Sequence, residues 1–456
     1  MQLHQRRSGV LLHPTSLPGV NTSQPCFGVL GEQAYRFIDF MEQCHFSYWQ
    51  VLPLGPTHDD RSPYNSLSTF AGNPDLIDNS TVKSISKQAL ENFYSSHRYW
   101  LKNYALFNAI RQHENNNHWV DWPETLRNRD PDTLHTFQRA HKGSIDQIIR
   151  QQYMFFKQWH ELKCYAHKRH IQIIGDLPIF VAHDSADVWS HPSLFKLDAN
   201  GYPIVVAGVP PDAFSETGQR WGNPLYNWET LKEYQFDWWV KRVQHALTLF
   251  DWIRLDHFRG FDACWEIPAA DTNASNGHWV AAGGKTLLQR LSQACDPLPL
   301  IAEDLGVITP SVEQLRDQFN LPGMRILQFA YDSDGKNPYL PHNHTLNSVV
   351  YTGTHDNNTT LGWYNSLSYE QQQKVQNYHA WPQEFMPWPL IKSVLASVSN
   401  LAVIPMQDLL ALDENHRMNT PGTITGNWQW QFSWNQISNE LPAYLASLNS
   451  IYDRIK

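Results

Sequence analysis

The sequence has few cysteines, no basic cluster and no long apolar segment. Its five cysteines are scattered and form no CxxC pair, which argues against a disulfide framework and favours a reducing compartment. The formal net charge is -9, whereas proteins that bind nucleic acid or anionic membranes carry clusters of positive charge, so neither is expected as a partner. No stretch approaches the roughly 20 apolar residues that span a bilayer, and the N-terminal residues lack the apolar core of a signal peptide. We therefore expect a cytoplasmic protein with a small or neutral ligand.

Aromatic residues, in contrast, are abundant. The chain of 456 residues contains 19 Trp, 19 Tyr and 21 Phe. Most of these rings are expected to pack in the core. Others are suited to stack against a ligand that has both flat apolar faces and hydroxyl groups. Sugars are ligands of this kind.

Eight short apolar runs with a bias towards β-branched residues predict eight strands, and segments with helical periodicity separate them. The predicted strands are 10–12, 48–54, 171–176, 252–256, 300–303, 324–331, 348–353 and 401–406. Strands that are apolar almost throughout and alternate with helices are typical of a parallel sheet covered on its outer face. An open doubly wound sheet is the competing fold, but no GxGxxG or GxxxxGK[ST] motif follows any run. We predict an α/β fold, a (β/α)8 TIM barrel with helical and loop insertions over its C-terminal face.

The spacing between these runs is uneven. The segments between the second and third runs and between the third and fourth are longer than one crossover helix. We predict one catalytic domain over 1–456, with a mainly helical insertion at 56–168 and a second insertion at 177–235 that includes an active-site loop at 208–226. No internal repeat or low-complexity linker marks another domain boundary.

Four of the predicted strands have an acid at their C-terminal end. These acids are Asp176, Asp256, Glu303 and Asp356. A single acid at a strand end is most often a helix cap or a loop acceptor, but in a barrel all the C-terminal strand ends meet at the face that carries catalytic residues. Arg254 lies two residues before Asp256, on the same face of its strand. It is expected to favour the ionised form of that acid.

Several carboxylates at one mouth are what retaining glycosidic chemistry requires. One carboxylate attacks the anomeric carbon, and a second, about 5 to 5.5 Å away, protonates the leaving oxygen and later deprotonates the acceptor. A third can hold sugar hydroxyls and favour the distorted transition state. His257 and His355 each adjoin one of the acids, so a metal site is the alternative, but no HxH or HExxH pattern occurs. We expect neither a metal nor an organic cofactor.

Three motifs carry most of these residues: IRLDHFRG at 253–260, IAEDLG at 301–306 and TGTHDN at 352–357. Together they closely resemble the 4-α-glucanotransferases, also called amylomaltases or disproportionating enzymes, which form glycoside hydrolase family 77 in the α-amylase clan. The similarity continues through HPTSLPG at 13–19, SPYNSLSTFAGNP at 62–74, GVPPDAFSETGQRWGNPLY at 208–226, LPGMRILQF at 321–329 and GNWQW at 426–430. It covers nearly the whole chain.

The resemblance implies a role for each matching residue. Asp256 would be the nucleophile, Glu303 the general acid/base and Asp356 the transition-state stabiliser. The implied substrate contacts are Tyr64, Asp176, Trp221, Asn223, Arg254, His257, His355 and Asn427. The sequence departs from the family at Asn358, because the family often has an acid after its HDN motif.

The resemblance also implies an activity. A segment of an α-1,4-glucan would pass to the 4-hydroxyl of glucose or a maltodextrin by a retaining double displacement. The partners would be α-1,4-glucans, maltooligosaccharides and glucose. Two other hypotheses stay open: an α-glucan hydrolase that uses the same acids and creates new reducing ends, and a glucan-binding protein on an inactive barrel. The inactive barrel would lack an essential acid, and all three acids are present.

Overall fold

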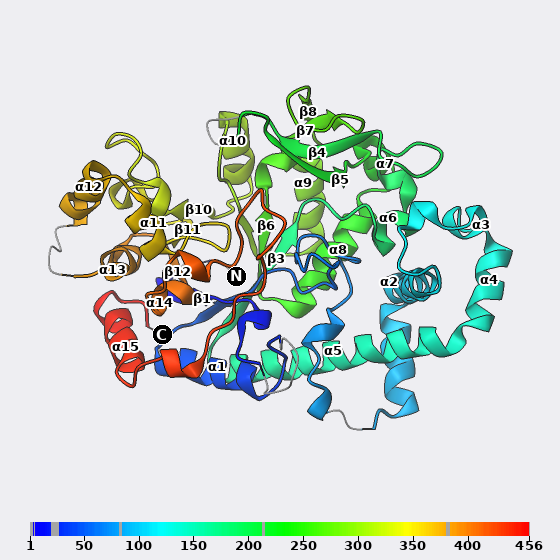
Figure 1. Ribbon diagram of the computed structural model, residues 1–456, viewed down its shortest axis with the longest axis horizontal. Helices are drawn as coiled ribbons and strands as arrows, with labels where there is room; N and C mark the ends of the chain where they lie inside the picture. The colour runs from blue at the N-terminus through cyan, green and yellow to red at the C-terminus, as the bar shows by residue number, and fades with distance from the viewer. Residues whose placement is uncertain are drawn as a thin grey trace.

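A closed barrel of eight parallel strands forms the centre of the molecule (Figure 1). The computed structural model describes residue 3 and residues 5–19, 27–81, 84–211, 215–379 and 384–455. The barrel strands are β1 (Arg7–Leu11), β2 (Tyr48–Gln50), β3 (Gln172–Pro178), β6 (Trp252–Asp256), β9 (Leu300–Ala302), β10 (Gly323–Ile326), β11 (Ser348–Tyr351) and β12 (Leu401–Pro405). They pair in the order β1-β12-β11-β10-β9-β6-β3-β2, and β1 closes the ring by pairing with β2. Each overlaps one of the eight predicted runs, so the predicted (β/α)8 barrel is confirmed.

The barrel strands alternate between the interior and the helical layer. Along β6, Trp252 belongs to the apolar cluster inside the barrel, whereas Ile253 and Leu255 belong to the cluster under the helices. Because the side-chain period of a strand is two, Arg254 and Asp256 share the inner face with Trp252. The interior is therefore apolar at its base and polar at its C-terminal mouth.

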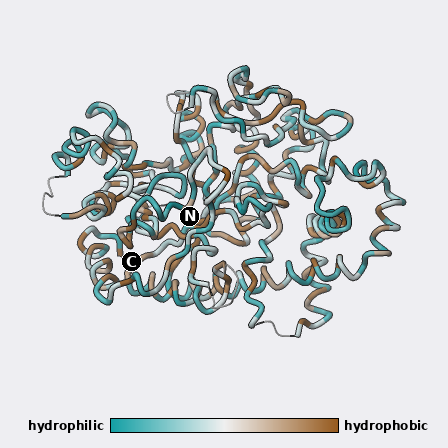
Figure 2. The backbone as a smooth tube through the Cα atoms, viewed as in Figure 1, coloured by the Kyte–Doolittle hydropathy of each residue, from teal (hydrophilic) through white to brown (hydrophobic). Residues whose placement is uncertain are grey.

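Helices cover the outside of the barrel. They are α1 (Glu32–Gln43), α5 (Lys142–Lys168), α8 (Asp237–Leu249), α9 (Gly284–Ala294), α10 (Pro310–Gln318), α13 (Trp388–Ala396) and α15 (Leu441–Ile451). In α1, Phe37, Ile38 and Met41 are buried at helical spacing, so one apolar face packs inward. Figure 2 shows hydrophobic and hydrophilic residues alternating along the outer helices. Among the described residues, no helix is long and apolar enough to cross a membrane.

Further helices extend from the barrel on both sides in Figure 1. Between β2 and β3 the chain forms α2 (Lys87–His113), α3 (Glu124–Arg127), α4 (Pro131–Ala140) and α5, and α2 packs against α5. The shorter helices are α6 (Ala186–Ser190), α7 (Trp228–Glu233), α11 (Thr360–Ser366), α12 (Tyr369–His379) and α14 (Met406–Leu409). The division of the chain into one domain with insertions at 56–168 and 177–235 stays a prediction.

A second sheet, which the sequence did not predict, lies beside β6 in Figure 1. It is antiparallel, in the order β5-β4-β7-β8, and consists of β4 (Val205–Val209), β5 (Gln219–Pro224), β7 (Ala263–Pro268) and β8 (His278–Ala281). Both ends of the predicted loop at 208–226 are therefore strand, and residues 212–214 of that loop lie outside the described residues. The sheet brings β5 close to the mouth of the barrel.

Candidate active site

Arg254 joins two acids at the ends of neighbouring strands. β3 and β6 pair in parallel with Asp176 opposite Arg254. The Nη1 of Arg254 donates to the two carboxylate oxygens of Asp176 at 2.9 and 2.8 Å and to Oδ1 of Asp256 at 2.8 Å. The side chains of Asp176 and Arg254 are buried, whereas that of Asp256 is 27% exposed. The guanidinium thus balances both charges from inside the barrel and leaves part of Asp256 open at the mouth.

Burial and charge act against each other in this cluster. Burial raises the pKa of Asp176, and the positive charge of Arg254 opposes that rise. Burial also disfavours the charged form of Arg254, but the two carboxylates outweigh it and hold the pKa of the guanidinium well above its usual range. Removing one member of such a cluster leaves an uncompensated buried charge. The three side chains therefore act as one electrostatic unit.

Glu303 lies next to Asp256 on the adjoining strand end. β6 and β9 pair in parallel with Leu255 opposite Ala302, so the residues that follow them, Asp256 and Glu303, lie side by side. The backbone N–H of His257 donates to Oε2 of Glu303 at 2.6 Å. Burial raises the pKa of Glu303 well above its usual range; the charge of Arg254 opposes the rise and that of Asp256 adds to it. A carboxyl of this kind keeps its proton at a pH at which an ordinary Glu has lost it, and a general acid must be protonated to act.

His257 connects the acids to the antiparallel sheet. Its φ of 51° is in the left-handed region, which is uncommon for a residue with a side chain and is often found at functional sites. Burial lowers the pKa of its ring to about 4, with the charge of Asp256 opposing. The ring of Trp221, on β5, meets that of His257 edge-on at 4.8 Å, and Trp221 is 39% exposed. Asn223, also on β5, uses its amide to donate to the carbonyl of Val181 at 3.0 Å.

Tyr64 links the mouth of β3 to the segment after β11. Its hydroxyl lies 2.7 Å from Oδ2 of Asp176 and 2.8 Å from Nε2 of His355, and the rings of Tyr64 and His355 stack at 5.3 Å. The Nε2 of His355 lies 3.4 Å from Oδ2 of Asp356, whose side chain is 48% exposed. A continuous chain of polar contacts therefore runs from Asp356 to Asp176. The structure brings all three predicted catalytic acids to the same mouth.

Comparison with known proteins identifies the family to which this chain belongs. The family model described as 4-alpha-glucanotransferase matches residues 12–91 and 79–436. The chain is a member of the 4-alpha-glucanotransferase family. The 4-alpha-glucanotransferases of Thermus thermophilus and of a Synechocystis species are each 43% identical to it, and each alignment covers 99% of both chains. The structure of an amylomaltase from Streptococcus agalactiae in complex with acarbose is 36% identical, with a TM-score of 0.94 over 99% of this chain and 100% of that one. The family predicted from the motifs is thus confirmed.

Among the predicted substrate contacts of this 4-alpha-glucanotransferase, Asn427 is engaged in its own loop. Its Oδ1 accepts from the backbone N–H of Thr420 at 2.9 Å, and its Nδ2 donates to the carbonyl of Thr423 at 3.0 Å. The next residue, Trp428, was not predicted, although it belongs to the GNWQW motif. Its ring lies 5.9 Å from that of Tyr64 and 6.0 Å from that of His355. The loop thus presents Trp428 to the site, while the amide of Asn427 holds the loop in shape.

Asp408 is a second residue that the sequence prediction missed. It lies just beyond β12, is 1% exposed, and accepts hydrogen bonds from the hydroxyls of Thr352 and Thr360, each at 2.6 Å. The backbone N–H of Thr360 donates to its other oxygen at 2.7 Å. Asp408 therefore joins the two ends of the 352–360 segment, which carries His355 and Asp356. Its position three residues after the end of β12 is the signal that could have identified it.

Asn419 holds Asp356 from the other side. Its Nδ2 donates to Oδ1 of Asp356 at 2.7 Å, and its backbone N–H donates to the carbonyl of His355 at 3.1 Å. Arg417 donates to the backbone carbonyl of Asp356 at 3.0 Å. No sequence signal marked these two residues, because they lie in an irregular segment far from any strand. Together they fix an acid whose side chain is otherwise half-exposed.

Proposed function

We propose that Asp256, Glu303 and Asp356 carry out the transfer reaction of this 4-alpha-glucanotransferase, as nucleophile, general acid/base and transition-state stabiliser. The observation that supports these roles is the contrast between two neighbouring acids. Asp256 pairs with Arg254 and is partly open at the mouth, whereas burial raises the pKa of Glu303. One acid is paired with an arginine and partly exposed, and the other is buried with a raised pKa. Two neighbouring carboxyl groups in such different surroundings are suited to act as nucleophile and general acid.

In the first step, a carboxylate oxygen of Asp256 attacks the anomeric carbon of an α-1,4-glucan. The bond from this carbon to the glycosidic oxygen breaks, and Glu303 donates its proton to that oxygen, so the reducing-end portion leaves as an alcohol. The product is a covalent β-glycosyl ester on Asp256. Asp356 binds sugar hydroxyls and favours the distorted, cationic transition state.

In the second step, an acceptor sugar binds where the reducing-end portion of the donor was, and its 4-hydroxyl faces the anomeric carbon. Glu303, now ionised, removes the proton from this hydroxyl as its oxygen attacks the anomeric carbon and displaces Asp256. The α-linkage is restored, because two inversions give retention. The number of glycosidic bonds is unchanged, so no reducing end is gained.

The predicted substrate contacts lie on two sides of the acids. Tyr64, Asp176 and His355 form one hydrogen-bonded group, and we assign it to the sugar on the donor side. Trp221 and His257 form the other side, where an exposed ring lies edge-on to a buried imidazole. We assign this side to the acceptor, where a stacked sugar would exclude competing water.

The proposed substrates are α-1,4-glucans and maltooligosaccharides, with glucose or a maltodextrin as acceptor. The solved amylomaltase relative holds acarbose. We also propose a cytoplasmic location, which is supported by free thiols: Cys44, Cys164, Cys264 and Cys295 are all unpaired in the described part of the chain.

The test of transfer is to incubate the purified protein with maltotriose alone and follow the oligosaccharide ladder and the reducing ends. We expect longer maltodextrins and glucose, with no net gain of reducing ends. Rising reducing ends without longer products would instead identify a hydrolase. The Asp256→Asn variant is the control for contaminating enzymes and should form no ladder.

A further inference from the structure

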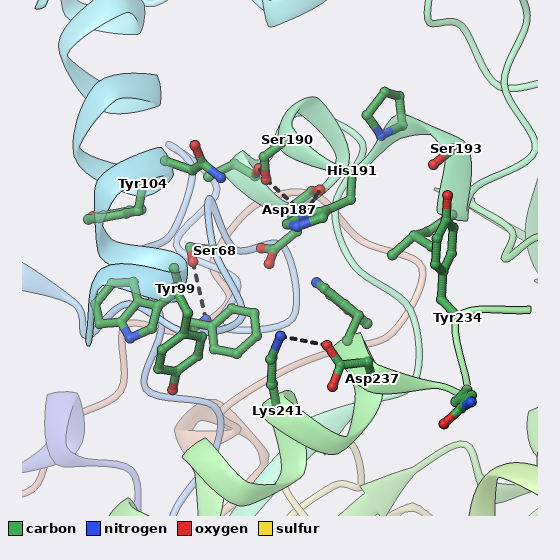
Figure 3. Close-up of a pocket in the computed structure, with 18 of the residues that line it drawn as sticks. Ser68, Tyr99, Tyr104, Asp187, Ser190, His191, Ser193, Tyr234, Asp237 and Lys241 are labelled. Carbon is green, nitrogen blue, oxygen red and sulfur yellow. Dashed lines mark hydrogen bonds and ion pairs between the residues drawn. The ribbon is translucent and has the colours of Figure 1, made fainter. Parts of the chain in front are cut away.

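A small cavity lies against the donor side of the site. The polar side chains that line it are those of His13, Ser16, His355 and Gln407, and the other side chains are apolar or aromatic. Its volume is about 20 Å³, which exceeds the roughly 10 to 15 Å³ that one water molecule needs. Figure 3 shows a separate and larger cavity of about 680 Å³ around Asp187, and none of these four residues lines it. The small cavity therefore belongs to the surroundings of His355 alone.

His13 is the first residue of the HPTSLPG motif, and its side chain has no part in the reaction proposed above. It lies two residues after the end of β1, at the face of the barrel that carries the acids. It is the N-cap of the 3-10 helix Pro14–Ser16, but its side chain makes no capping hydrogen bond. The residue is 7% exposed, and its Nδ1 is buried without a hydrogen-bond partner among the described residues. Buried polar atoms usually have a partner, so Nδ1 of His13 is expected to bind one in the cavity.

His355 has the same feature on the other side of the cavity. The residue is 6% exposed, and its Nδ1 is also buried without a hydrogen-bond partner among the described residues. Burial and, to a smaller extent, the charge of His355 lower the pKa of His13 to about 3. His13 is therefore neutral near pH 7 and has one donor and one acceptor nitrogen. Two ring nitrogens without partners at one cavity of this size indicate that they share a single small polar molecule.

The hydrogen bonds of Tyr64 place a proton on the other nitrogen of His355. The carboxylate of Asp176 is paired with Arg254 and can only accept, so the hydroxyl of Tyr64 donates its proton to Oδ2 of Asp176 at 2.7 Å. The oxygen of Tyr64 then accepts from Nε2 of His355, which lies 2.8 Å away. The same Nε2 lies 3.4 Å from Oδ2 of Asp356. In a neutral His355 with its proton on Nε2, Nδ1 is an acceptor and requires a donor.

We propose that one water molecule in this cavity donates a hydrogen bond to Nδ1 of His355 and is held in place by Nδ1 of His13. Buried water typically makes about three hydrogen bonds, and the amide of Gln407, which is 8% exposed, supplies the third. His13 is thus a positioning residue: through the water it keeps His355 neutral, with the proton on Nε2 directed to Tyr64 and Asp356. The effect on catalysis rests on the proposed function, whereas the state of the His355 ring does not.

Three substitutions of His13 separate this polar role from simple packing. His13→Phe fills the space with an apolar ring and has no atom that can hold the water. His13→Gln carries its amide near the position of Nε2, and His13→Asn carries its amide near that of Nδ1, so only Asn keeps a polar group facing the water. His135→Phe is the matched control, because His135 is exposed on α4. Thermal unfolding of each variant shows whether it folds.

The direct readout is the protonation of His355, measured by nitrogen-15 NMR of protein with labelled histidine rings. The signals of His355 are identified by their loss in His355→Gln. In the wild type, His13→Asn and His135→Phe, we expect Nδ1 to have the shift of a ring nitrogen without hydrogen and Nε2 that of a ring N–H. In His13→Phe and His13→Gln, we expect this pattern to be lost, with a proton on Nδ1. A merely structural role of His13 would lower Tm and leave the pattern unchanged.

Kinetics give a second readout. The kcat/KM for maltotriose should fall about tenfold in His13→Phe and His13→Gln, as for one lost hydrogen bond, and stay close to the wild-type value in His13→Asn and His135→Phe. If His13→Phe does not fold, His13→Gln still decides the question. A wild-type His355 with protons on both nitrogens, or an unchanged pattern in His13→Gln, would overturn the proposal, as would an equal loss of rate in His13→Asn and His13→Gln. If the ring pattern changes as expected but the wild type disproportionates nothing, the proposed function fails and the positioning of His355 stands.

Discussion

The Nη1 of Arg254 donates to Oδ1 of Asp256 at 2.8 Å, from two residues earlier on the same strand. The alternation of β6 turns both side chains into the barrel, so the proposed nucleophile receives its balancing charge from its own strand. The same nitrogen also donates to Asp176 on the adjoining strand. One guanidinium therefore contacts both acids and supplies a positive charge between them.

Replacing Arg254 with Met keeps much of the side-chain length but removes the charge. We expect a loss of about 3 to 5 kcal/mol in the free energy of unfolding, because two acids lose their common partner. Turnover should fall as well, since Asp256 is no longer held. Denaturant unfolding and maltotriose kinetics measure the two effects, and Arg139→Met, at an exposed position of α4, is the control. If Arg254→Met does not fold, Arg254→Lys should fold and still lose turnover, because Lys lacks the planar fork. Normal stability and rate in Arg254→Met would contradict this account.

The raised pKa of Glu303 predicts how activity depends on pH. A carboxyl whose pKa is raised in the folded protein stays protonated to higher pH, and its acid form is lost as the pH rises through that value. The kcat/KM for maltotriose should therefore fall on the alkaline side. With α-maltosyl fluoride as donor, whose leaving group needs no proton, Glu303→Gln should keep measurable release of fluoride without this alkaline fall. If the activity of Glu303→Gln still decreases at alkaline pH as in the wild type, that decrease comes from the titration of another group.

Asp408 is expected to position the 352–360 segment rather than touch the substrate. Asp408→Asn puts a donor where two hydroxyls and one backbone N–H now donate, and a buried group left without its partner costs about 1 to 3 kcal/mol. We expect a lower Tm and a lower kcat for maltotriose with little change in KM. Asp146→Asn, at an exposed position of α5, is the matched control. A stable Asp408→Asn variant with normal kcat would exclude this positioning role.

Trp221 is expected to help exclude water from the acceptor side. Its exposed ring lies edge-on to His257, so Trp221→Ala should open this side and raise the ratio of hydrolysis to transfer several-fold. Reducing ends measured beside the oligosaccharide ladder give the ratio. Trp279→Ala is the control, since Trp279 is 36% exposed on β8 of the same sheet. The same ratio in both variants would assign the exclusion of water to other residues.

The barrel was predictable because its strands are buried on both faces and therefore appear as short apolar runs. The antiparallel sheet was not, because β5 has the sequence QRWGNP, in which neither face is consistently apolar. The predicted strand at 324–331 also proved too long. It ends at Ile326, and the 3-10 helix Leu327–Phe329 follows, where Gln328 donates to the carbonyl of Asn358 at 2.8 Å.

The acids of the site were predictable because each lies near the C-terminal end of a strand, and barrel strand ends converge. The residues that hold Asp356 were not. Asp408 makes its three hydrogen bonds to residues about 50 positions away in the sequence, and no local pattern reports such a partner. For Asn427 the motif indicated a place near the site. It did not indicate that the side-chain amide forms its hydrogen bonds within its own loop.

The central claim is that Asp256 forms the covalent intermediate, and trapping that intermediate tests it most directly. The Glu303→Gln variant is treated with an α-maltosyl fluoride whose terminal 4-hydroxyl has been removed, so that the sugar can react as a donor but cannot be extended. The protein is then digested and its peptides are analysed by mass spectrometry. We predict one maltosyl-derived group on the peptide that contains Asp256, and none when Asp256→Asn is added. A sugar on Asp176 or Asp356 instead, or release of fluoride at the same rate in the double variant, would contradict the assignment.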